Sequence, residues 1–423
     1  MPSKNTFALD STALVLPYII RKDIPPVYRC LLTLYEEIDP VVLTQAVRDL
    51  APRFPFMYTR LRRGFIWDRL EEVPACAILE KDDGRLCRPF DYRGEEPLIR
   101  VVYRKNELGL EFTHFTNDGT SGTVYLFSLA ARYFELRGHA VEKNRFILDY
   151  RDTPSQAELT DAFRMSYGKP EKRIRQIVPP AFQGPGERQD GYLRVTTAQI
   201  PIDAMKTMLK EKYGGCTITE YLTAVYALAY LRLYEKSDKR RPVRLEVPGN
   251  LRQHWDTDTL RNFSAIANIN AVPDKAEYGF DDILEHVRRE MQENLTKDKM
   301  QAFIYQNVRY LKLLSVIPGF VKRAAFLLGF PLLNAMWPIT SSMSNPGYFR
   351  LPDSLAEHIR YYETIMGRYG TYRVVGAAAG IKNTLSITFS AFNESTEIQD
   401  FCIGFWERDE LSVQVFERRG QAK

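Results

Sequence analysis

The chain has 423 residues, of which 45% are hydrophobic and 12% aromatic, so it is not disordered throughout. At roughly 150 residues per domain, this length predicts two or three folding units. The 58 basic and 53 acidic residues give a net charge of +5 and are spread along the chain. That spread excludes the clustered basic surface of a nucleic-acid-binding protein. It is compatible with an anionic small ligand or a membrane surface.

The cysteines indicate a reducing compartment. There are five of them, an odd number without Cys-x-x-Cys spacing: Cys30, Cys76, Cys87, Cys216 and Cys402. This pattern predicts neither a disulfide framework nor a zinc or other metal site. The N-terminal residues are too short and too interrupted in their apolar pattern to be a signal peptide. We therefore expect a cytoplasmic protein.

The first hundred residues show strand and helix periodicities. Alternation predicts a strand over 28–38, and helical spacing predicts a helix over 41–50 after Asp39-Pro40. Two apolar runs, 53–58 and 61–67, predict a hairpin around Gly64. The arginines of this hairpin are compatible with phosphate binding or with a plain solvated face.

The functional prediction rests mainly on residues 110–119. It alternates like a strand and then ends in a polar turn at Asp118 and Gly119, where Asp bonds its own backbone and Gly accepts a positive φ. Helical spacing over 123–136 places a helix start just after this turn. His114 at the strand end is suited to general-base work, because its unperturbed pKa lies near neutral pH.

Residues 150–192 lack sustained periodicity and are rich in Pro, Gly and charge, which predicts a long surface connection. We therefore expect a first lobe over 1–165, a crossing linker over 166–191 and a second lobe over 192–423. The linker carries basic residues that suit either an anionic ligand or a solvated surface: Lys169, Lys172, Arg173 and Arg175.

The second half alternates strand and helix patterns. Strands are expected at 192–200, 244–247, 265–271, 372–379 and 384–392, and helices at 203–213, 221–234, 280–294 and 398–408. Thr217 and Glu220 form a capping pattern ahead of the second of these helices. Arg252, after the strand at 244–247, is placed to hold the Asp118 carboxylate in a fixed rotamer.

Residues 311–337 are the most apolar part of the chain. Pro318, Lys322, Arg323 and Pro331 interrupt them, so no transmembrane span is expected. We expect core helices that line an apolar channel, with a membrane-surface face as the alternative. The following run, 339–347, contains Ser344 and Asn345, whose donors suit an oxyanion, although such a run is also typical of a simple loop.

Four motifs lie in order along the chain. They are Arg53-Phe54-Pro55 leading into Gly64-Phe65-Ile66-Trp67, the HxxxDG sequence of residues 114–119, Asn250-Leu251-Arg252 with Thr259-Leu260-Arg261-Asn262-Phe263, and Ser344-Asn345-Pro346-Gly347. Together they resemble the chloramphenicol acetyltransferase-like acyltransferase superfamily, in particular its bacterial alcohol acetyltransferase and condensation-domain-like branch. The resemblance covers essentially the whole chain.

This resemblance implies an α/β fold of two similar lobes, each of mixed β-sheet with flanking helices, and a tunnel between them. His114 would be the base at mid-tunnel, and Asp118 would pair with Arg252 to keep the loop in shape. Gly119 would leave room for a pantetheine arm. Ser344 and Asn345 would supply oxyanion or substrate contacts.

The implied activity is acyl transfer from a CoA thioester, or from an acyl carrier protein, to an alcohol acceptor. Neither a bound cofactor nor a metal is implied, and the protein would act as a monomer, with peripheral membrane contact left open. Thr113 stands where peptide-forming condensation domains and wax-ester synthases usually carry a second His, which disfavours peptide chemistry. A non-catalytic binding protein of the same fold and a carrier-protein-dependent condensation enzyme remain alternatives.

Overall fold

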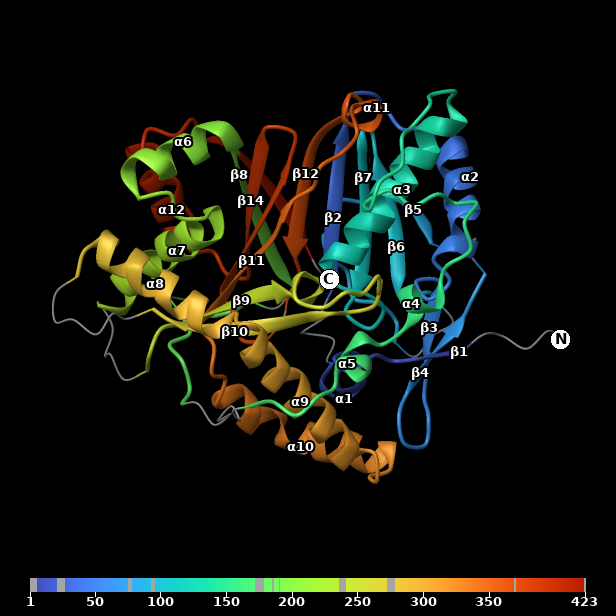
Figure 1. The fold of residues 1–423 in the computed structure, drawn as a ribbon, viewed down its shortest axis with the longest axis horizontal. Helices are drawn as coiled ribbons and strands as arrows, with labels where there is room; N and C mark the ends of the chain where they lie inside the picture. The colour runs from blue at the N-terminus through green and yellow to red at the C-terminus, as the bar shows by residue number, and fades with distance from the viewer. Residues whose placement is uncertain are drawn as a thin grey trace.

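Two large β-sheets, each covered by helices on its outer face, make up most of this computed structural model (Figure 1). The structure describes residues 6–20, 27–74, 78–92, 96–171, 179–184, 186–189, 191–235, 241–271, 278–368 and 370–421. Cys76 and the linker residues Lys172, Arg173 and Arg175 lie outside these ranges, so the expectations for them are not described further.

The first sheet has five strands. Their order is β12 (Ile359–Met366), β2 (Val27–Leu34), β7 (Glu107–Thr113), β6 (Ile99–Arg104) and β5 (Leu79–Lys81). Helices α2 (Pro40–Leu50) and α3 (Gly119–Leu136) cover its outer face (Figure 1). β12 comes from the second half of the chain and pairs antiparallel with β2. The second half thus completes the first sheet, and the lobe boundaries at 165 and 191 stay a prediction.

The second sheet has seven strands. Their order is β10 (Ser264–Asn270), β9 (Arg244–Asn250), β11 (Ser341–Tyr348), β13 (Val374–Ile381), β14 (Thr384–Ala391), β8 (Tyr192–Pro201) and β15 (Gln414–Gln421). Its outer face packs against α6 (Ile202–Lys212), α7 (Ile218–Tyr234), α8 (Phe280–Asn294) and α12 (Glu397–Arg408). Two sheets with separate helical layers match the predicted α/β fold class.

Local sequence signals account for the helices that fix the two lobes. α7 begins with the predicted capping box, in which Thr217 and Glu220 satisfy each other's backbone amides. α7 and α3 are apolar around most of their circumference, because each is buried between a sheet and other helices. In α3, a Cβ at Gly122 would lie 2.6 Å from the Phe112 ring, so only glycine permits this close approach of helix to sheet.

The predicted hairpin is present but displaced along the chain. β3 (Thr59–Arg62) pairs with β4 (Arg69–Glu72), with Leu61 opposite Leu70, and β1 (Thr6–Ala8) pairs with the other edge of β4. The prediction that 53–58 forms a strand is therefore wrong. Ala51–Arg53 instead form a short 3-10 helix, and residues 54–58 form the turn that leads into β3.

The expectation of core helices over 311–337 is also wrong. This segment contains the end of α9 (Lys297–Leu314) and α10 (Gly319–Ala335), which form a helical pair at one end of the molecule (Figure 1). The first part of α9 packs on β10, whereas α10 lies outside the two sheets. Leu328 is 81% exposed and Val316 79%. Apolar composition predicted burial, but it carries no information about which side of a helix faces the protein. No helix in the described part of the chain combines the length and apolarity needed to cross a bilayer.

Four cysteines are buried as free thiols: Cys30, Cys87, Cys216 and Cys402. The remaining short helices are α1 (Leu16–Ile19), α4 (Gln156–Leu159), α5 (Ala162–Met165) and α11 (Asp353–Ala356). Of these, α1 contacts α10, and α5 contacts α9. These contacts attach the helical pair to the body of the protein.

Candidate active site

The loop between β7 and α3 carries His114 and Asp118. β7 ends at Thr113, so His114 is the first residue after the strand, and α3 begins at Gly119 with Asp118 as its N-cap. The Asp118 Oδ1 accepts the Ser121 amide at 3.0 Å, which satisfies one free donor at the helix start. Gly119 does not adopt the positive φ expected for it. Its Cβ position instead faces open space.

Asp118 is held by residues from the connection between β9 and β10. Arg252 Nη1 donates to its Oδ2 at 2.8 Å, and the Phe263 backbone amide donates to the same oxygen at 2.9 Å. The ion pair that the resemblance implies is therefore formed. It joins residues 134 apart in the chain, one from each half.

Arg252 is itself fixed by backbone carbonyls of its own connection. Its Nε donates to Thr259 O at 2.9 Å and its Nη2 to Arg261 O at 2.6 Å. Burial alone would raise the pKa of Asp118, but the charge and hydrogen bonds of Arg252 outweigh it and hold that pKa below its usual value. Asp118 is therefore a charged anchor, and its oxygens are directed to protein donors.

Asn262 holds His114 from the same connection. Its Oδ1 lies 2.9 Å from His114 Nδ1, while its Nδ2 donates to His114 O at 2.8 Å and to Asp10 Oδ2 at 2.7 Å. The His114 carbonyl oxygen and the Asp10 carboxylate oxygen can only accept hydrogen bonds, so the Asn262 group that faces them must be the NH₂, and this fixes the orientation of the amide. The Asn262 oxygen must then accept a proton from Nδ1. His114 is held as the Nδ1–H tautomer, and Nε2 keeps its lone pair.

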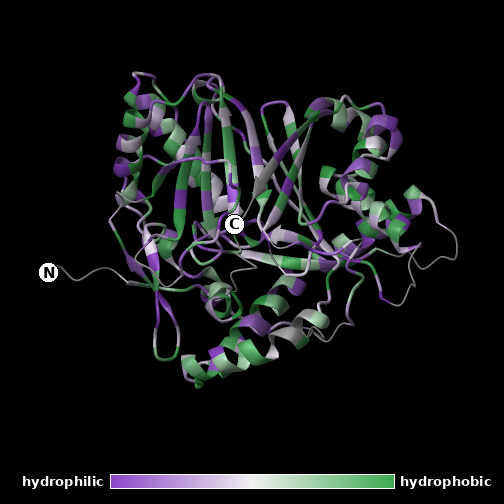
Figure 2. Ribbon diagram, turned by 180° about the vertical axis from the view of Figure 1, so that it is seen from behind, coloured by the Kyte–Doolittle hydropathy of each residue, from purple (hydrophilic) through white to green (hydrophobic). Residues whose placement is uncertain are grey.

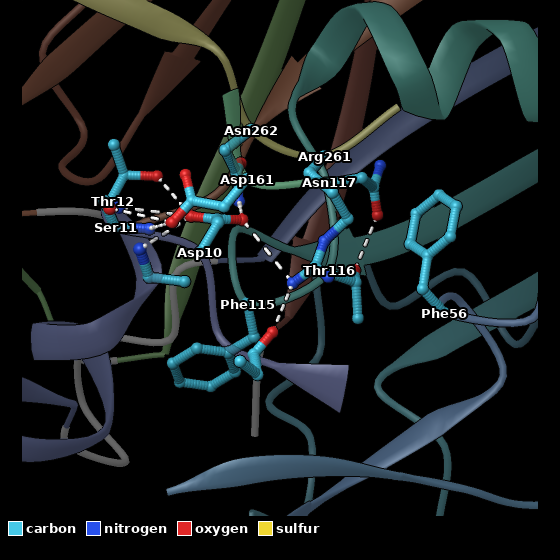
Figure 3. Close-up of polar contacts among 12 residues, drawn as sticks. Asp10, Ser11, Thr12, Phe56, Phe115, Thr116, Asn117, Asp161, Arg261 and Asn262 are labelled. Carbon is cyan, nitrogen blue, oxygen red and sulfur yellow. Dashed lines mark hydrogen bonds and ion pairs between the residues drawn. The ribbon is translucent and has the colours of Figure 1, made fainter. Parts of the chain in front are cut away.

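A second layer of buried charge supports Asn262. Figure 3 shows Arg261 and Asn262 next to Asp10 of the N-terminal segment, with Asp161 close by. The Asp10 Oδ1 accepts the Ala13 amide at 3.0 Å, and Arg261 Nη2 lies 3.8 Å from its Oδ2. Burial first, and then the charge of Asp10, raise the pKa of Asp161. Three segments distant in sequence thus meet behind the His114 loop.

His114 lines a cavity of about 420 Å³ between the two sheets. Other lining residues come from the start of α3 and its N-cap, from β9, β11 and α9, and from the connection between β9 and β10: Asp118, Gly119, Glu246, Asn262, Phe303, Asn307, Ser342, Ser344 and Asn345. The half-buried ring also makes an edge-on contact with Tyr28, at 4.3 Å between ring centroids. The sequence-predicted residues His114, Asp118, Gly119, Ser344 and Asn345 thus share one cavity, and Arg252 supports it from behind.

Ser344 and Asn345 lie in β11 and not in a simple loop, at a register shift against β13. Asn345 Nδ2 donates to Thr219 Oγ1 at 2.9 Å, and its Oδ1 accepts the Gly347 amide at 2.9 Å. These bonds fix the plane of the amide group at the cavity wall. Thr113, directly before His114, is buried and accepts the Phe115 amide through Oγ1.

Glu246 is a cavity residue that sequence reasoning missed. It lies opposite Ser342 on the neighbouring strand β11, and Tyr372 donates its hydroxyl to Glu246 Oε2 at 2.6 Å. Burial raises the pKa of Glu246, against the lowering effect of the Tyr372 hydrogen bond. The buried Ser342 hydroxyl has no hydrogen-bond partner among the described residues. A single Glu within a strand carries no sequence signal, so only the fold reveals this polar group.

Solved structures with the same architecture cover nearly the whole chain. Polyketide synthase associated protein 5 from Mycobacterium tuberculosis matches with a TM-score of 0.63 at 13% identity, over 95% of this chain and 98% of its own. Trichothecene 15-O-acetyltransferase from Fusarium sporotrichioides matches with a TM-score of 0.59 at 12% identity, over 95% of both chains. The starter condensation domain of rhizomide synthetase, solved with C8-CoA and Leu-SNAC, matches with a TM-score of 0.56 at 12% identity, over 96% and 94%.

The chain has the fold of condensation domains and chloramphenicol acetyltransferase-like acyltransferases. No family model matches the sequence, and no curated protein matches it significantly. At these identities the likeness establishes the condensation-domain-like fold alone.

Removal of Arg252 should destabilise this condensation-domain-like fold. Arg252→Met leaves the buried Asp118 carboxylate without its counter-charge, so we predict a loss of about 3 kcal/mol in the free energy of unfolding, measured by urea denaturation. The control is Arg151→Met. It removes an ion pair to Asp149 from an arginine that is 71% exposed, and should leave the free energy of unfolding almost unchanged, because solvent screens such a pair. Equal losses in the two variants would contradict a structural role for Arg252.

Glu246 should impose a pH dependence on stability. Its folded pKa is raised, so the folded protein binds this proton more tightly than the unfolded chain, and stability is lost as pH rises through the folded value. Glu246→Gln abolishes that loss while its amide oxygen still accepts from Tyr372. We predict that the melting temperature of the variant exceeds that of the wild type at about pH 8 and converges with it toward about pH 4. A difference that is constant with pH would contradict the raised pKa.

Proposed function

We propose that the protein transfers an acyl group from a CoA thioester to an alcohol acceptor, with His114 as the general base. One observation carries this proposal: Asn262 orients the His114 ring so that Nε2 is left with its lone pair, and the ring lines a cavity between the sheets. A base must be unprotonated at the atom that accepts the proton and must be reachable by the acceptor. His114 meets the first condition through its tautomer and the second through its place in the cavity wall.

The reaction that follows from this arrangement has two steps. His114 Nε2 takes the proton from the acceptor hydroxyl as that oxygen attacks the thioester carbonyl, which forms a C–O bond and a tetrahedral oxyanion. Collapse of the oxyanion breaks the C–S bond, and the thiolate leaves with the proton from Nε2. The base is thereby restored, and the products are the ester and free CoA.

Two further donors in the lining of the cavity suit the oxyanion. Ser344 and Asn345 line the same cavity as His114, and the bonds to Thr219 and Gly347 hold the Asn345 amide in one orientation. Preorganised donors of this kind stabilise developing charge without reorganisation during the reaction. We assign them as oxyanion or substrate contacts, whereas Asp118 is a positioning residue that holds the loop.

The donor is proposed to be an acyl-CoA. The rhizomide starter domain of the same fold was solved with C8-CoA, and Gly119 leaves open space beside the cavity where a pantetheine arm would pass. Asn345 also borders a neighbouring hollow of about 470 Å³, and we propose this hollow as the side from which the donor approaches. Condensation domains share this fold, so delivery of the acyl group by a carrier protein is the second candidate.

The proposal predicts that His114→Ala abolishes turnover. We expect free-thiol release from acyl-CoA, of acetyl to octanoyl length with pooled alcohols, to fall by about 100-fold to 10,000-fold, since a positioned base contributes that factor. The control is His139→Ala, which removes an exposed histidine that makes an edge-on contact with His358, away from the cavity.

Retained thiol release in His114→Ala, with the wild type active, would refute the base assignment. Absence of release in the wild type, with release from acyl-loaded carrier protein under the same conditions, would favour the carrier-dependent alternative. Absence with both donors would favour a non-catalytic binding protein.

A further inference from the structure

The outer side of α10, together with the end of α9 and the adjoining loops, is an exposed apolar surface. It is formed by Leu313, Val316, Phe320, Val321, Leu327, Leu328, Leu332 and Met336, each 42% to 81% exposed. Phe65, which is 74% exposed, adjoins them, because the Gly319 amide donates to Phe65 O at the start of α10. We call this set the α10 face. Figure 2 shows hydrophobic residues along this helix, at the end of the molecule remote from the sheets.

The polarity of α10 is inverted relative to an ordinary surface helix. Lys322 is 2% exposed, with Nζ lying 3.2 Å from the centroid of the Trp67 ring, and Arg323 pairs with the buried Asp68 at 2.6 Å. Burial lowers the pKa of Lys322, because the charged form of this inward-facing side chain is less well solvated than in water. A water-facing helix would place its cations outside and its leucines inside.

Inward cations also fix the helix to the body of the protein. Besides Arg323, Phe326 stacks on Tyr18 of α1, at 6.2 Å between ring centroids. The outward direction of Leu327 and Leu328 is therefore set by packing on the other side of the helix. A contiguous exposed apolar patch of this kind marks an interaction surface.

The stretch of chain that contains α10 carries charged residues of one sign. The sequence contains no Asp or Glu between Asp298 and Asp353, and all charged side chains in that interval are basic: Lys299, Arg309, Lys312, Lys322, Arg323 and Arg350. Arg309 and Lys312 are exposed, on the last turns of α9 next to Leu313. Leucine and phenylalanine beside exposed Lys and Arg, without acids, match the requirements of an anionic lipid interface.

These features favour a bilayer over a second copy of the chain. A two-fold dimer through the α10 face would bring Arg309 and Lys312 of the two copies toward one another, without acids on that stretch to compensate. The face also lies along the edge of a projecting helical pair, a shape that inserts into a lipid interface more readily than it forms a flat protein interface (Figure 1).

We propose that the α10 face docks on membranes rich in anionic phospholipid, with its apolar side chains buried at the headgroup boundary and Arg309 and Lys312 near the phosphates. The protein would then be a peripheral membrane protein that lies on the bilayer. This docking goes beyond the acyl-transfer proposal and does not depend on it. The proposed docking surface includes the end of α9, and the same helix contributes Phe303 and Asn307 to the His114 cavity.

The test is co-sedimentation with vesicles of phosphatidylcholine, with or without phosphatidylglycerol. We expect the wild type to pellet with the anionic vesicles and to be released by high salt, because the basic contribution is screened. The double variant Leu327→Glu/Leu328→Glu should lose binding by at least about tenfold, since it places two acids in the interface. Val41→Glu, which changes a 77% exposed residue on α2, is the matched control and should bind like the wild type.

Equal binding of the double variant and the wild type would overturn the proposal. The proposal would also be overturned if the wild type does not bind vesicles but forms a dimer, and the double variant is a monomer. That result would assign the α10 face to contact with a second copy of the chain. Circular dichroism and thermal unfolding check that both variants fold. Turnover with soluble substrates should be unchanged in the double variant, so a failure of the acyl-transfer proposal stays distinguishable from a failure of membrane docking.

Discussion

The whole candidate site depends on hydrogen bonds and an ion pair between two segments: the connection between β9 and β10, and the loop after β7. Arg252 and Phe263 bind the Asp118 carboxylate, and Asn262 binds both the ring and the backbone carbonyl of His114. The loop residues come from the first half of the chain, and the residues that bind them come from the second half. Since every one of these contacts crosses between halves, the base is positioned only when both halves are folded and docked.

In this arrangement the charged residues of the site are distinct from the residue proposed as the base. The charged pair of Asp118 and Arg252 lies behind the loop, where burial makes its removal costly and its geometry rigid. The group that lines the cavity is an imidazole, and an uncharged amide orients it. Asp10 acts one step further away, because it fixes the direction of the Asn262 amide and thereby the tautomer of His114.

The sequence predicted those parts of the site that have local signals. A His at a strand end followed by Asp and Gly is visible in residues 114–119, and an Arg after a strand suggested a partner for Asp118. The roles of Asn262, Asp10 and Glu246 were not visible, because each depends on contacts between residues more than a hundred positions apart. Periodicity also located most strands and helices, including the start of α3 and the capping box of α7.

Two errors have physical causes of their own. Residues 311–337 were expected in the core because apolar residues usually lie inside, but α10 turns its cations inward and its leucines outward. Gly119 was expected to serve a turn with a positive φ, whereas it opens the first turn of α3 where a side chain would project into open space. Composition and residue type suggest what a position can do, but the packing around it decides what it does.

The central claim is that Asn262 holds His114 as the Nδ1–H tautomer, and NMR of the protein labelled with ¹⁵N-histidine tests it directly. The account predicts that, above the pH at which the ring loses its proton, the His114 signals show a protonated Nδ1 and an unprotonated Nε2. Asn262→Ala should relax this preference, and the signals missing in His114→Ala provide the assignment. A His114 ring protonated at Nε2 in the wild type would contradict the account, because the atom that faces the acceptor would then carry a proton and could not act as the base.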